Sequence, residues 1–270
     1  MKSYLITTIA SFLTLFLAVS AQGDQLSIPP TVDRILPFPS GEFNVEAIGF
    51  GDDGFLWIGG RDTNQFYRLN PSDGAVLQSF SDGNTSSADI DVHAGILYGL
   101  EEPNKISRFD TSTGAQLSSI EGPVIGGTRG LTFLSGHLYV SGVISAGKGV
   151  QIGKADSANG NLLASVDAQD LVPTSSLGRI GDNLGYLVGP EMFEEVHDIY
   201  LNIVNPLTGE LLEKQVLFTA YDDLWGLDAS DQELFVARRD LGQILVYTIP
   251  EPATLSLLML GGLMFLPRRR

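Results

Sequence analysis

The sequence predicts an all-β fold, a five-bladed β-propeller-like body built from four-stranded repeats. Three observations support it: a turn motif that occurs four times, an aromatic strand marker that occurs five times, and an unpaired strand pattern ahead of the first repeat. The body spans residues 22–249. The segments on either side of it, residues 1–21 and 250–270, have the composition of targeting signals.

The turn motif opens with Asn or Asp, and a glycine follows four residues later and a leucine three residues after that. An Asn or Asp side chain can accept a hydrogen bond from the backbone two residues ahead, and glycine supplies the positive φ that closes a hairpin. The motif therefore predicts the same hairpin in four repeats. Its four copies carry Asn70, Gly74 and Leu77; Asp110, Gly114 and Leu117; Asp156, Gly160 and Leu163; and Asn205, Gly209 and Leu212.

The strand before each turn has apolar residues four and one positions ahead of the Asn or Asp, such as Phe66 and Leu69. An offset of three does not alternate, so these strands are expected to be buried on both faces, between neighbouring sheets. An aromatic marker precedes them at spacings of 41, 41, 47 and 49 residues, which suit a four-stranded blade. The five markers are Trp57, Tyr98, Tyr139, Tyr186 and Phe235.

The fifth repeat ends at "ILVYTIPEP", without the turn and without a last strand. The segment from Asp33 to Pro39 is the unpaired strand, and we expect it to complete the fifth blade and close the ring. An open β-solenoid or a sandwich is the alternative architecture. The stretch "DDGFLWIGG" and its counterparts resemble the loose repeats of NHL-type and regulator-type bacterial propellers, a resemblance that implies a fold and no particular function.

The amino terminus has Lys2, an apolar stretch from Leu5 to Val19 and small residues before Gln22. This order predicts a secretory signal peptide, residues 1–21, cleaved between Ala21 and Gln22. An uncleaved membrane anchor is the alternative. The 270-residue chain contains no cysteine, so an exported body would be stabilised without disulfides, and thiol chemistry is excluded.

The carboxyl terminus, residues 250–270, combines Pro250-Glu251-Pro252, a short apolar stretch over residues 253–266, and the basic cluster Arg268, Arg269 and Arg270. The stretch would form a short transmembrane helix whose arginines stay in the cytoplasm. This order resembles the PEP-CTERM sorting signal of Gram-negative bacteria. The resemblance implies processing by a membrane exosortase, transient inner-membrane association, and delivery to the cell surface or extracellular matrix, often alongside exopolysaccharide. A proline-rich linker before a tail anchor is the alternative.

The exported body keeps 12 basic and 31 acidic residues, so its formal charge is −19. Such a body would repel nucleic acid and anionic lipid and would attract cations weakly. Acidic pairs occur at Asp52-Asp53, Glu101-Glu102 and Asp222-Asp223, but none has the spacing of a dedicated calcium loop. We expect no cofactor, with a divalent cation such as Ca²⁺ as the one candidate ligand.

No motif nominates a catalytic nucleophile, and His93, His137 and His197 fall at different places within their repeats. The sequence therefore favours a non-catalytic surface or matrix protein whose propeller binds a carbohydrate, a protein or itself. The alternative is a propeller enzyme of the lactonase or lyase type with a metal in the channel. No catalytic or metal-binding residue is predicted.

The repeats differ in length at one place, which indicates a binding site. Repeats three and four contain extra residues between their second and third strands, in 141–149 and 189–198. Variable loops on a fixed frame are where binding usually occurs. The candidate binding loop consists of Glu191, Met192, Phe193, Glu194 and Glu195, in which two apolar side chains among carboxylates would suit a sugar ring or a cation-bridged glycan. Filling of a gap between blades is the alternative role.

Overall fold

The computed structural model describes residues 31–83, 87–101, 104–123, 127–143, 150–168, 176–188, 197–220 and 224–249. The chain divides into two units, Ile28–Ile249 and a second unit formed by Met1–Ser27 and Pro250–Arg270. The predicted signal peptide, the Pro-Glu-Pro tripeptide, the apolar stretch and the arginine cluster lie outside the described residues. In the described part no helix is long and apolar enough to cross a membrane.

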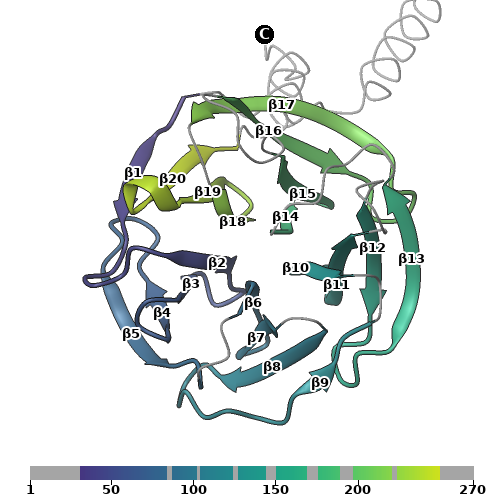
Figure 1. The fold of residues 1–270 in the computed structure, drawn as a ribbon, viewed down its shortest axis with the longest axis horizontal. Helices are drawn as coiled ribbons and strands as arrows, with labels where there is room; N and C mark the ends of the chain where they lie inside the picture. Colours follow the sequence, from purple (N-terminus) through teal and green to yellow (C-terminus); the bar gives the residue numbers. More distant parts are fainter. Residues whose placement is uncertain are drawn as a thin grey trace, which may run out of the picture. The chain divides into compact units, whose positions relative to one another are not determined.

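The described residues between 31 and 249 form five four-stranded antiparallel sheets arranged as blades around a central axis (Figure 1). The prediction of an all-β, five-bladed propeller is therefore confirmed. Blade 1 contains β2 (Val45–Phe50), β3 (Leu56–Gly60), β4 (Gln65–Leu69) and β5 (Val76–Ser81). Blade 2 contains β6 (Asp89–His93), β7 (Ile96–Glu101), β8 (Lys105–Asp110) and β9 (Ile120–Glu121).

The other three blades repeat the same order from the axis outward. Blade 3 contains β10 (Gly127–Leu134), β11 (His137–Val143), β12 (Val150–Ala155) and β13 (Leu162–Ala168). Blade 4 contains β14 (Gly178–Ile180), β15 (Asn183–Val188), β16 (His197–Val204) and β17 (Leu211–Ala220). Blade 5 contains β18 (Leu224–Ala229), β19 (Glu233–Arg238), β20 (Gln243–Thr248) and β1 (Arg34–Pro37), and a 3-10 turn, η1 (Arg239–Leu241), joins β19 to β20.

The ring closes as predicted, because β1 is the outer strand of blade 5 although it precedes blade 1 in the sequence. It pairs antiparallel with β20, with Arg34 opposite Val246 and Pro37 opposite Gln243. The Arg34 guanidinium makes a bidentate contact with Glu233, at 2.5 and 2.8 Å, and donates to the Pro71 carbonyl in the turn between β4 and β5 of blade 1. This strand therefore ties the fifth blade to the first.

The four predicted hairpin turns are present, each between the third and fourth strands of its blade. In the turn of blade 1, the Asn70 side chain accepts from the backbone of Ser72, and the Gly74 N–H donates to the Asn70 carbonyl at 2.8 Å. The same two kinds of bond occur at the other three turns. All four glycines have φ between 70° and 77°, so the positive φ inferred from the sequence is observed.

The turn glycines have a second role that the sequence did not reveal. Each turn packs against the outer strand of the preceding blade, so that a Cβ at the glycine would lie 3.2 Å or less from it. A Cβ at Gly160 of blade 3 would lie 1.7 Å from the carbonyl oxygen of Glu121 in β9, and one at Gly114 of blade 2 would lie 2.6 Å from Phe80 in β5. The glycines therefore permit both the hairpin and the close contact between blades.

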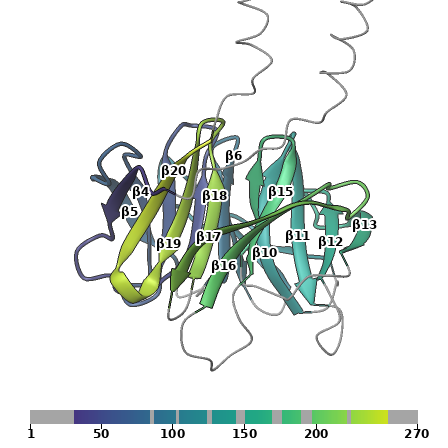
Figure 2. The same ribbon diagram turned by 90° about the horizontal axis from the view of Figure 1, so that it is seen from above.

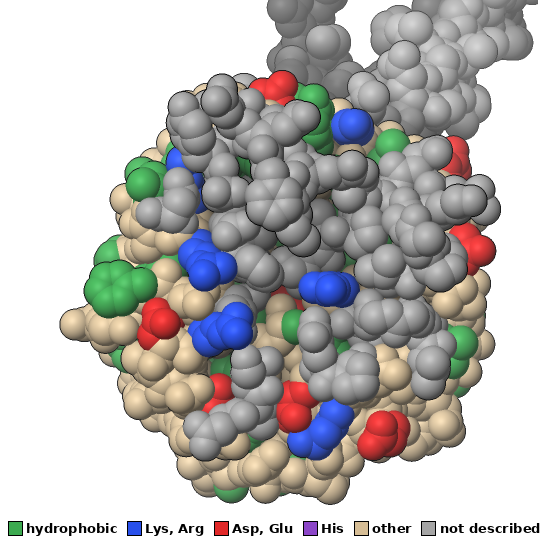
Figure 3. Space-filling model, viewed as in Figure 1, with side chains coloured by type: hydrophobic (Ala, Val, Ile, Leu, Met, Phe, Trp, Pro, Cys, Tyr) green, Lys and Arg blue, Asp and Glu red, His purple; other side chains and the backbone are tan. Residues whose placement is uncertain are grey.

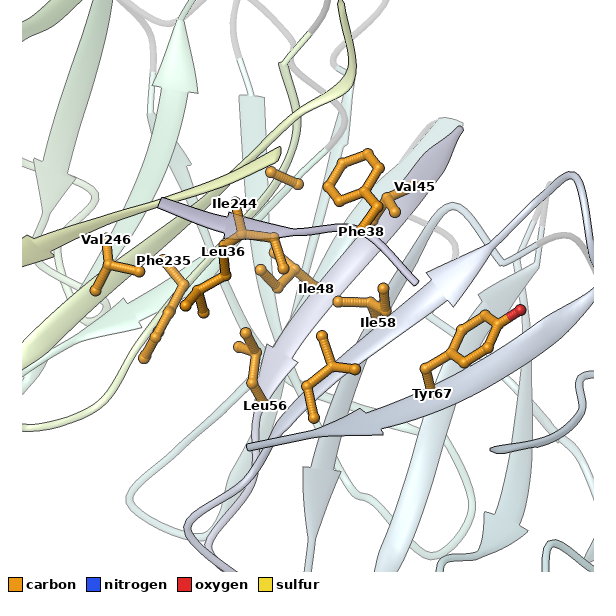
Figure 4. Close-up of a cluster of buried hydrophobic side chains, with 12 residues drawn as sticks. Leu36, Phe38, Val45, Ile48, Leu56, Ile58, Tyr67, Phe235, Ile244 and Val246 are labelled. Carbon is orange, nitrogen blue, oxygen red and sulfur yellow. The ribbon is translucent and has the colours of Figure 1, made fainter. Parts of the chain in front are cut away.

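The hydrophobic core lies between the blades, where the third strands are buried on both faces as expected. The five aromatic markers are all buried, each on the second strand of its blade. Figure 4 shows the cluster between blades 5 and 1, in which Leu36 and Phe38 from the closing segment pack with Ile48, Phe235 and Ile244. The closing strand thus supplies core residues as well as backbone hydrogen bonds.

Candidate functional site

One face of the propeller carries the connections between second and third strands and the connections between blades, because neighbouring strands are antiparallel. We call it the loop face; its described segments include residues 38–44, 61–64 and 239–242. It is at the bottom of Figure 2 and faces the viewer in Figure 3. The strand bounds place residues 144–149 between β11 and β12 and residues 189–196 between β15 and β16. The predicted binding loop, Glu191 to Glu195, therefore lies outside the described residues and stays a prediction.

In blade 1 the loop face is built around a buried carboxylate, Glu42, which is 3% exposed. Its Oε1 accepts from the backbone N–H groups of Asn44 and Asp62, both at 3.1 Å. Its Oε2 accepts from the Thr63 hydroxyl at 2.8 Å and from the Thr63 N–H at 3.3 Å. Glu42 therefore joins the connection from β1 to β2 to the connection from β3 to β4. A side chain at Gly60 would occupy the place of this carboxylate.

The axis of the propeller contains three buried aspartates, Asp89 and Asp91 on β6 and Asp228 on β18, each at most 2% exposed. Asp89 Oδ2 accepts from the N–H groups of Leu131 in blade 3 and Leu177, which precedes β14 in blade 4, at 2.9 and 3.0 Å. These bonds connect the inner strands of three blades directly.

The other two aspartates repeat this arrangement. Asp91 Oδ2 accepts from the Phe133 N–H at 2.6 Å and from the Thr132 hydroxyl at 3.1 Å. Asp228 accepts from the Phe50 N–H of blade 1 and the Arg179 N–H of blade 4. Together the three carboxylates link all five inner strands through backbone N–H groups, so the geometry gives them a structural role at the axis.

Burial dominates the electrostatics of this cluster, because a carboxylate loses its hydration inside the protein. It raises the pKa of Asp89 and of Asp91 well above the usual range, and it raises the pKa of Asp228 to about 6. The backbone N–H groups oppose the rise by stabilising the charged form, and Arg179 acts in the same direction on Asp228. The cluster therefore holds protons more tightly than exposed carboxylates do.

Among the described residues, the histidines and paired acids that could have held a metal are dispersed. His93 lies 3.3 Å from Asp52 and stacks on Phe133, whereas His137 is exposed at the start of β11. Asp53 pairs with Arg68. In the described part, no group of three or more His, Cys, Asp or Glu side chains is arranged to hold a metal ion.

Sequence reasoning singled out adjacent acidic pairs and missed the axial aspartates. A signal was present, because Asp91 and Asp228 each precede an aromatic marker by seven residues, at Tyr98 and Phe235. An acidic residue at one repeat position inside an otherwise apolar strand indicates a buried, hydrogen-bonded role. Neither Glu42 nor Asp89 has a comparable repeat signature.

Comparison with known proteins supports the class, a β-propeller. No protein-family model and no curated protein matches the chain, so the resemblances to the sorting signal and to NHL-type repeats remain predictions. Among solved structures, glutaminyl cyclase from Myxococcus xanthus is similar at 11% identity and a TM-score of 0.59, over 82% of this chain and 97% of that chain. BamB from Moraxella catarrhalis is similar at 14% identity and a TM-score of 0.44, over 78% and 85% of the respective chains. The first of these similarities shows the fold alone.

Proposed function

We propose that the protein is an exported propeller, sorted to the cell surface or extracellular matrix by an exosortase, that binds exopolysaccharide without catalysis. The observation that carries the binding part is the closed ring with buried aspartates at its axis. The carboxylate oxygens of Asp89, Asp91 and Asp228 accept backbone hydrogen bonds. Because these carboxylates are buried and bonded within the protein, we assign ligand binding to the loop face instead. There, repeats three and four contain their extra residues.

The sorting part of the proposal rests on the two ends of the sequence. A signal peptide at residues 1–21 and Pro250-Glu251-Pro252 followed by an apolar stretch and three arginines form a consistent pair of export signals. The body between them is a compact unit that ends at Ile249, immediately before the tripeptide. A propeller of this kind can fold separately from both signals.

Processing of the tail is expected to remove Arg268, Arg269 and Arg270 from the mature protein. Prolines on both sides of Glu251 keep the tripeptide extended and outside the membrane helix, where an enzyme can reach it. Mass spectrometry of the protein extracted from the cell surface tests this. Glu251→Ala should leave the precursor in the inner membrane, with Asp231→Ala, an exposed change in the body, as the control. An intact C-terminal peptide in surface material would contradict the sorting proposal.

Shortening both long loops, residues 144–149 and 189–196, to the four residues that separate β3 from β4 is expected to weaken association with the cell's own exopolysaccharide. The strands that hold these loops are unchanged, so the body should unfold at the same temperature as the parent protein. Cosedimentation with the purified polysaccharide measures the loss. Full retention by a folded variant would place binding elsewhere.

The alternative, a propeller enzyme of the lactonase or lyase type, requires ligands for a metal in the channel. The axial carboxylates already accept several N–H groups, which leaves them poorly arranged as cation ligands. Metal analysis of the purified protein distinguishes the two functions. A stoichiometric bound ion together with hydrolytic or lyase activity would favour the enzyme.

A further inference from the structure

We propose that Phe43 is a sugar-stacking residue on the loop face and that it binds an uncharged hexopyranose unit of a polysaccharide. The inference rests on the proposed function, which supplies a glycan as the ligand. It adds the residue that contacts the ligand and the chemical class of the sugar. The site belongs to the described part of the loop face and is independent of the loop at Glu191 to Glu195.

Phe43 is unusually exposed for an aromatic residue. Its side chain is 75% exposed, and it is the one aromatic among the exposed large hydrophobic residues of the described part. The aromatic markers, by contrast, are at most 5% exposed. Leaving a phenyl ring in water forgoes the hydrophobic stabilisation that its burial would give. The position therefore displays an aromatic face that folding does not use.

The backbone that carries this ring is fixed by the network around Glu42. The Phe43 N–H donates to the Asp62 carboxylate at 3.0 Å. The Glu42 carboxylate accepts from the N–H of Asn44, in the connection from β1 to β2, and from the N–H of Asp62, in the connection from β3 to β4. The Tyr67 hydroxyl donates to the Thr63 hydroxyl at 2.8 Å, which anchors the network to β4. The backbone that displays the ring is already ordered by these bonds, so binding at the ring does not have to order this part of the chain.

The surroundings of Phe43 fit a sugar better than a protein. The residues next to it in the sequence are the polar Glu42 and Asn44. The facing connection from β3 to β4 contributes two more polar residues, Asp62 and Thr63. A stable protein interface needs a desolvated apolar centre and roughly 1,000 Å² or more of buried surface. Figure 3 shows that hydrophobic side chains on the described part of this face form separate spots. A pyranose needs only one aromatic face for its C–H groups and polar groups at its edge for its hydroxyls.

Charge favours an uncharged sugar. Asp62 and the exposed Arg61 both lie in the connection beside Phe43, so the local charge is mixed, and the repulsion of a uronate or sulfated unit comes from the body as a whole, whose formal charge is −19. Stacking of a neutral ring has no such cost and needs no bridging cation. Binding through Phe43 should therefore be insensitive to moderate salt and to EDTA.

Affinity electrophoresis of the full chain, in gels that contain dextran, a soluble mannan, a soluble β-glucan or alginate, tests the proposal. The parent protein is expected to be retarded by at least one neutral polymer and not by alginate. Phe43→Ala should weaken that retardation about tenfold, the effect of losing one aromatic contact of about 1.4 kcal/mol. Phe43→Trp should retain it. Leu207→Ala is the matched control, because Leu207 is 71% exposed in a turn on the opposite face.

Each other outcome overturns the proposal in a recognisable way. If Phe43→Ala binds the neutral polymer as the parent does, the residue assignment is wrong while polysaccharide binding stands. If the parent binds no polymer in the set, the glycan part of the proposed function fails together with this inference. If Phe43→Ala changes the oligomeric state in size-exclusion chromatography, the ring contacts a second copy of the chain instead. Equal thermal unfolding of the variants confirms that binding alone has changed.

Discussion

Deletion of residues 33–39 is expected to unfold the propeller or convert it to oligomers. The deletion removes β1 and leaves β20 as an unpaired edge, with the backbone groups that now bond to β1 exposed. It also removes Leu36 and Phe38 from the cluster between blades 5 and 1. Loss of two large core side chains costs about 2 to 5 kcal/mol each, which is comparable with the whole stability of a typical domain.

The ion pair adds a smaller contribution to closure. Arg34 bonds to Glu233 and to the Pro71 carbonyl, so its loss would loosen the contact between blades 5 and 1. Because both charged groups are partly exposed, this contact alone contributes less than the apolar burial does. The deletion should therefore be far more damaging than Arg34→Ala.

Urea unfolding and size-exclusion chromatography measure the effect of the deletion. The matched control is a chain that begins at residue 31, which keeps every described contact of β1. A synthetic peptide of residues 31–42 added to the deleted protein should restore the monomer and its unfolding transition. A deleted protein that stays monomeric and unfolds like the control would show that closure through β1 contributes little.

The fold could be predicted from the sequence because its repeats carry local chemistry. The Asn or Asp with its glycine defines a hairpin without tertiary information, and buried aromatics such as Trp57 and Tyr98 mark the second strands. The missing last strand of the fifth repeat and the unpaired strand at Asp33 to Pro39 indicated the closure. The turn and marker signals come from residues close together in the sequence, where spacing translates directly into geometry, whereas the closure followed from one missing strand at one end of the body and one unpaired strand at the other.

The site was less predictable because its contacts join distant residues. Glu42 bonds to Asp62 and Thr63 across a gap of about twenty residues, and nothing in the sequence around "SGEFN" indicates a buried carboxylate. Asp89 bonds to Leu177, 88 residues away. Backbone N–H groups leave no trace in a sequence, so a carboxylate that they satisfy looks like an ordinary surface acid.

Asp89→Ala is expected to destabilise the body by about 2 to 5 kcal/mol, because it leaves buried backbone donors without an acceptor. The donors that lose their partner belong to Leu131 and Leu177, so the contacts between blades 2, 3 and 4 at the axis are weakened together. Urea unfolding at neutral pH measures the change. Asp231→Ala, at an exposed position in the hairpin between β18 and β19, is the control and should change stability by less than about 0.5 kcal/mol.

Asp89→Asn separates the hydrogen bonds from the charge. Its amide oxygen can occupy the position of Oδ2 and keep both bonds to the other blades, while its NH₂ group takes the place of Oδ1, so that the bond lost is the local one from the Ile90 N–H. Burial already raises the pKa of the Asp89 carboxyl, so a neutral group is well tolerated there. The Asn variant should therefore lose less than half of the stability that the Ala variant loses. If both variants are equally destabilised, the charge and not the bridging oxygen holds the blades together. If the Ala variant is as stable as the parent protein, the structural role of the axial aspartates is contradicted.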